Sequence, residues 1–70
     1  MITDDELKKI LRDAIKNSGN NISQWARENG LEKQRGNISE IAYGDRKISE
    51  VIGKVLGYKR DPKRWVKKKE

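Results

Sequence analysis

The feature that most constrains the fold of this 70-residue chain is a pair of short helical patterns separated by a glycine. They occupy Ile22–Ser49, with the sequence ISQWARENGLEKQRGNISEIAYGDRKIS. Gly30 follows the first pattern and permits the left-handed backbone that reverses a chain within a few residues. The second pattern ends at Gly44 and has apolar residues at helical spacing, namely Ile38, Ile41 and Ala42. The stretch therefore predicts two short helices held at a fixed angle by a tight turn.

A longer helix is predicted ahead of this stretch. Thr3 and Glu6 match the T-x-x-E pattern of a capping box, and Gly19 is the expected stop. One apolar stripe is expected to face the core, made of Leu7, Ile10, Leu11, Ala14 and Ile15. The charged residues between them are expected to face solvent, namely Lys8, Lys9, Arg12, Asp13 and Lys16.

The two short helices have different starting signals. Asn21 is the expected cap of the first, with Gln24 as its capping partner. Its inward-facing residues are expected to be Trp25 and Ala26. The second is expected to begin near Lys33 or Gln34, because a later start would leave too few helical residues. Gly36 then lies in its first turn at a cost of up to about 1 kcal/mol relative to Ala, which is tolerable if the helix needs a thin edge there.

A fourth helix is predicted from about residue 49 to residue 56, with Ser49 as its cap and Gly57 as its stop. Its expected buried positions are Val51, Ile52, Val55 and Leu56. Residues 64–67 are expected either to form a short strand or to stay disordered. Tyr58, Trp65 and Val66 suggest that this tail folds back onto the body or onto a second subunit, with Trp65 as a tail anchor, a dimer contact or a stacking residue.

The positive charge of the chain is concentrated at its C-terminal end. The whole chain has 17 Lys and Arg against 11 Asp and Glu, a net charge of +6. Residues 58–70 hold seven basic and two acidic residues, so this segment alone carries +5. The expected organisation is one domain over 1–57 and a basic C-terminal tail over 58–70. Such a tail suits a polyanion, nucleic acid first, or simply keeps the chain in solution.

Composition disfavours several classes of function. The chain has no Cys and no His, which excludes disulfides and removes the commonest metal ligand and general base. We therefore expect no metal, no cofactor, no small-molecule substrate and no enzymatic activity. No apolar run approaches about 18 residues and no signal peptide is recognised, so a cytoplasmic protein is expected.

The residues that support a family resemblance lie between about positions 5 and 58. They are Trp25-Ala26, Gly30-Leu31, Ile38-Ser39, Ile41, Gly44, Arg46 and Val55-Leu56-Gly57-Tyr58. This set resembles the Cro/CI-like (lambda-repressor-like, XRE-type) helix-turn-helix regulators, especially the small ones of phages and mobile elements. The resemblance implies an all-α fold, a compact four-helix lambda-repressor-like domain with a basic C-terminal tail. It also implies a repressor that binds double-stranded DNA as a homodimer on an inverted repeat. The spacing from Gly30 to Ile38 is longer than is usual in the family.

The resemblance implies which side chains read base edges in the major groove. Gln34, Arg35 and Asn37 would project from the N-terminal end of the recognition helix, and Glu40 and Tyr43 from the same outward face. Arg suits guanine, and Gln or Asn suits adenine, each good bidentate pair discriminating by about 1–3 kcal/mol. Glu40 would accept from cytosine N4, or else would pair with Arg35 or reject wrong sites by its charge.

Phosphate contacts are expected at both ends of the helix pair. At the start of the first short helix, where backbone N–H groups point outward, the candidates are Asn21, Ser23 and Gln24. The other candidates are Lys33, Arg46 and Lys47. Each of these residues has an alternative role as a helix cap or a solvated charge.

A second function is compatible with the same fold. The chain would then be a protein-interaction module, such as an antitoxin or an antirepressor. An acidic outward face on the second short helix would favour that function, whereas Gln34, Arg35 and Asn37 argue against it. Membrane binding through the tail is disfavoured because no amphipathic helix with a broad apolar face accompanies it.

Overall fold

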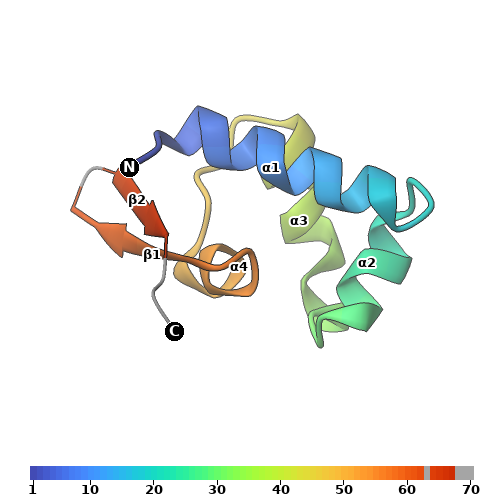
Figure 1. Cartoon of the computed structure of the whole chain (residues 1–70). Coiled ribbons are helices and arrows are strands. Elements are labelled where there is room, and N and C mark those ends of the chain that lie inside the picture. Colours follow the sequence, from blue (N-terminus) through green and yellow to red (C-terminus); the bar gives the residue numbers. More distant parts are fainter. Residues whose placement is uncertain (63, 68–70) are drawn as a thin grey trace.

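The computed structural model describes residues 1–62 and 64–67. The elements follow in the order α1 (Asp4–Asn17), α2 (Ile22–Glu28), the 3₁₀ turn η1 (Glu32–Gln34), α3 (Arg35–Tyr43), α4 (Glu50–Val55), β1 (Tyr58–Asp61) and β2 (Arg64–Lys67). Figure 1 shows α1 lying across α3 and the two strands beside the N-terminus and α4. The strands pair antiparallel, with Tyr58 opposite Lys67. The helical part of the expected fold is confirmed, but a two-stranded sheet makes the chain more than all-α.

The first helix begins and packs as its sequence predicts. Thr3 and Glu6 form the reciprocal capping box, and Gly19 has a positive φ of 84° just beyond the helix. In the apolar stripe, the fully buried residues are Leu7, Leu11 and Ile15. The half-buried residues are Ile10 and Ala14.

Arg12 corrects the expectation of a wholly solvated charged face on α1. Its Nη1 donates a hydrogen bond to the carbonyl oxygen of Ala42, at 3.0 Å. Ala42 lies in the last turn of α3, where carbonyl groups have no partner within the helix. Arg12 therefore satisfies one of these carbonyls and ties α1 to the C-terminal end of α3.

The turn between α2 and α3 explains the long spacing from Gly30 to Ile38. Asn21 caps α2 by accepting from the backbone N–H of Gln24 at 3.2 Å, as predicted. Gly30 has a φ of 71°, and the next backbone N–H returns to the carbonyl oxygen of Ala26 at 2.7 Å. The residues that lengthen the connection form η1, so α3 begins at Arg35, slightly later than predicted.

Gly36 lies in the first turn of α3, as predicted, but the reason expected for it is not met within the chain. A Cβ at this position would have no described atom within 4 Å. Among the described residues, no backbone segment lies so close to Gly36 that a larger side chain would be excluded.

The hairpin belongs to the hydrophobic core. Trp65 is 1% exposed, and its Nε1 donates to Asp4 Oδ1 at 2.5 Å. Ile2 and Trp65 also exchange backbone hydrogen bonds of 2.9 and 2.8 Å. Of the two outcomes left open for residues 64–67, the structure shows the short strand; β1 is an addition to the prediction, and Trp65 anchors the hairpin to the helices.

The burial of α4 differs from the prediction at Val51, which is 47% exposed. Ile52 and Gly53 are the buried residues of α4, and the Trp65 ring packs against Gly53. Because Ile52 and Gly53 face the core, Val51 lies on the outer side of the helix. Within residues 1–62 and 64–67, no helix is long and apolar enough to cross a bilayer.

Candidate nucleic-acid interface

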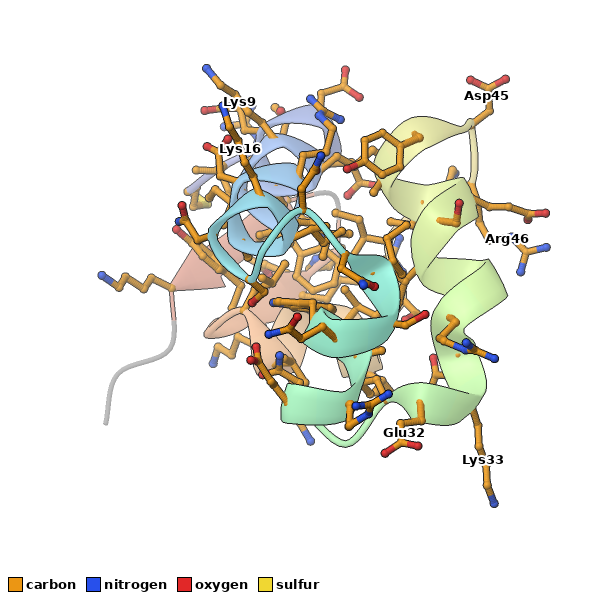
Figure 2. The ribbon with its side chains drawn as sticks, turned by 90° about the vertical axis from the view of Figure 1, so that its right-hand side faces the viewer. Lys9, Lys16, Glu32, Lys33, Asp45 and Arg46 are labelled. Carbon is orange, nitrogen blue, oxygen red and sulfur yellow. The ribbon has the colours of Figure 1, made fainter. Side chains whose placement is uncertain are left out.

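The outward face of α3 is defined by the residues opposite its buried stripe. Ile38, Ile41 and Ala42 are buried, whereas Gly36, Glu40 and Tyr43 are exposed at i, i+4 and i+7. Asn37 and Ser39 lie half-buried beside them. Figure 2 shows α3 along one edge of the molecule, with Lys33 projecting at one end and Arg46 at the other. The exposed face is therefore bracketed by cations at both ends.

Arg35 points toward α2 and not along the middle of this face. Its Nη1 donates to Ser23 Oγ at 3.1 Å, which joins the first turns of α2 and α3. Two adjoining open depressions share the lining residues Ser23, Glu32, Lys33 and Arg35. The structure thus brings Arg35, expected among the base readers, together with two residues expected at phosphates.

Arg27 is a cation of this region that the sequence did not reveal. It is exposed and lines one of the two depressions with Lys33 and Arg35. With Glu32 as the acidic residue of the lining, the depression has a net positive charge. The signal that predicts Arg27 is its position four residues after Ser23, on the same side of α2.

The other end of α3 holds three predicted site residues together. Arg46 Nε lies 3.0 Å from Glu40 Oε2, and Arg46 Nη1 donates to Asn37 Oδ1. The Glu40–Arg35 ion pair, one of the alternatives for Glu40, is not formed, because Glu40 pairs with Arg46 and Arg35 is bound to Ser23. Two residues expected to read bases, Asn37 and Glu40, are thus bound by Arg46, a residue expected to contact phosphate.

The remaining candidates lie apart from these two groups. Gln34 is half-buried at the cap position of α3 and its side chain makes no capping bond. The Gln24 amide donates to Glu28 at 3.4 Å instead of returning to the cap, and Asn21 is used as a cap. Lys47 is exposed in the loop after Arg46.

In the part of the chain that the structure describes, no three Asp or Glu residues gather as they would around a metal ion. The arrangement offers exposed hydrogen-bonding groups on a helix and cations beside it, which suits recognition of a polyanion. Comparison with protein-family models, with curated proteins and with solved structures found no match.

Proposed function

We propose that this protein is a sequence-specific double-stranded DNA-binding regulator of the lambda-repressor-like helix-turn-helix class, with α3 as its recognition helix. The observation that supports this most is the exposed face of α3 at the molecular edge, bracketed by Lys33 and Arg46. A helix with its side chains is about 10–12 Å across, which matches the major groove at about 12 Å.

The roles follow from where the side chains lie. Glu40 and Tyr43 are exposed on the outward face of α3 and Asn37 lies half-buried beside them, so these three are the proposed base readers. Arg27, Lys33 and Arg35 surround the depression beside α2 and are proposed to hold one phosphate backbone. Arg46, which pairs with Glu40 in the free protein, and the exposed Lys47 follow the C-terminal end of α3 and are proposed to contact the other phosphate backbone.

A single α3 spans about half of a typical operator. We therefore propose a homodimer whose two recognition helices lie about 34 Å apart, one turn of DNA, on an inverted repeat. Occlusion of a promoter by this dimer is the proposed mechanism of repression.

Selection from random duplexes tests this function. The wild-type chain is expected to enrich a palindromic motif, and the affinity for that motif is expected to fall steeply as salt rises. Arg46→Ala is expected to weaken binding to this motif more than Lys16→Ala does. Lys16→Ala removes the same charge and serves as the control, because Figure 2 shows Lys16 on α1, away from α3. Enrichment of no motif, or equal losses in the two variants, would contradict the proposal.

A protein-interaction module, such as an antitoxin or an antirepressor, is the second candidate. It is favoured by Glu40 at the centre of the outward face and by Tyr43, which is 58% exposed. Such a module would enrich no duplex, and any weak DNA binding would be independent of sequence.

A further inference from the structure

Arg46 follows the end of α3, and its side chain folds back onto the helix. A Cβ on Gly44 would lie 2.7 Å from the carbonyl oxygen of Glu40, so only glycine fits this exit. Two residues later, Arg46 meets the Glu40 carboxylate at 3.0 Å and also donates to Asn37. The guanidinium therefore covers the polar groups at the centre of the outward face of α3.

The ion pair is open to solvent on both sides. The Arg46 side chain is 55% exposed and the Glu40 side chain 63% exposed. Exposed pairs of this kind contribute little to stability and are screened by salt. The pair can therefore open on binding without unfolding the helix.

Glu40 faces an electrostatic conflict if α3 enters a groove. Its carboxylate would approach DNA phosphates, which repel it unless a cation or a hydrogen-bond donor compensates. Arg46 compensates it in the free protein. In the major groove, the cytosine N4 amino group is a donor suited to a carboxylate.

We propose that Glu40 and Arg46 form an exchangeable pair that sets sequence specificity, an inference that rests on the proposed DNA-binding function. On a cognate site, cytosine N4 donates to Glu40 and releases Arg46 to a phosphate. On other sequences Glu40 finds no donor, so it retains Arg46 and that phosphate contact is not made. Glu40 is thus a specificity residue that acts partly by positioning Arg46.

Glu40→Gln tests the exchange because it keeps the side-chain size and removes the charge. Arg46 then loses its charged partner on every sequence and keeps only neutral acceptors such as Asn37, which hold a guanidinium more weakly. Affinity for a non-cognate duplex is expected to rise about tenfold, and its slope of log K against log salt to steepen by about 0.9, the value for one phosphate. In a repeated selection, the motif is expected to lose its cytosine preference at one position in each half-site.

Two further variants separate this exchange from a general effect of charge. Asp45→Asn removes a neighbouring carboxylate, and Figure 2 shows Asp45 and Arg46 pointing in different directions. This control is expected to leave the non-cognate slope and the motif unchanged. The double variant Glu40→Gln with Arg46→Ala is expected to return the non-cognate slope to its wild-type value.

The outcomes distinguish the inference from the function on which it rests. If the wild type enriches a motif but Glu40→Gln leaves slope and motif unchanged, the inference is wrong and the function stands. An equal effect of Asp45→Asn would overturn the exchange in the same way. If the wild type binds no duplex, both the function and the inference are wrong.

Discussion

At the scale of single residues, the arginines at the two ends of α3 are held by different partners: Arg35 is its first residue, and Arg46 follows its last. Arg46 is bound by Glu40 and Asn37 on the outward face of α3, whereas Arg35 is bound by Ser23 of α2. The sequence assigns Arg35 to base reading from its place at the start of α3. Its hydrogen bond directs the guanidinium to the cationic depression, where a phosphate is the expected ligand.

Replacing Arg35 tests this assignment. Arg35→Ala is expected to weaken binding to cognate and non-cognate duplexes by the same factor and to reduce the salt slope by about 0.9, because it removes one phosphate contact. Titrations of both duplexes at several salt concentrations measure the two quantities. If Arg35→Ala changes the selected motif and leaves the affinity for non-cognate duplexes unchanged, Arg35 reads a base and does not contact a phosphate.

At the scale of elements, the helix caps and the glycine stops were predictable, but the side of α4 that packs was not. Asn21 and Ser49 cap α2 and α4 as expected, because a cap depends on residues within one turn. The exposure of Val51 depends instead on the Trp65 ring, which lies against Gly53 from a distant part of the chain. Helical periodicity alone does not report that contact.

Gly53→Ala measures how tightly α4 packs on the hairpin. A Cβ at Gly53 would lie 2.2 Å from Cζ3 of Trp65, whose ring is held by Asp4. The free energy of unfolding is expected to fall by about 1–3 kcal/mol, as for other overpacked cores. Urea denaturation measures it.

Gly36→Ala is the matched control for this substitution. It lies in α3, where no described atom is within 4 Å of the added Cβ, so a gain of up to about 1 kcal/mol is expected from helix propensity. Equal effects of the two substitutions would contradict the packing assigned to Gly53.

At the scale of the whole molecule, the hairpin closes the core that the helices leave open. Trp65 contributes the largest of the fully buried side chains, and it joins the hairpin to α1 and to the N-terminal residue Ile2. A domain this small buries a modest share of its surface, so losing one such side chain matters. The domain boundary predicted after residue 57 therefore separates the helices from a hairpin that packs against them.

A chain ending at residue 57 tests that boundary. Without Trp65 it is expected to lose its cooperative thermal transition, as followed by circular dichroism at helical wavelengths. In the full chain, Trp65→Ala is expected to lower the free energy of unfolding by about 3–5 kcal/mol. A shortened chain that melts like the full one would make residues 1–57 an independent domain.

The sequence by itself determined the caps of α1, α2 and α4, the Gly30 turn and the buried faces of α1 and α3, because these depend on residues a few positions apart. Only the tertiary structure decided which side chains pair across the fold. Arg12 binds Ala42 across 30 positions, and Trp65 binds Asp4 across 61. Arg46 pairs with Glu40, for which the sequence suggests an ion pair with Arg35 as an alternative to base reading. Such pairings depend on how the elements pack, which no local pattern encodes.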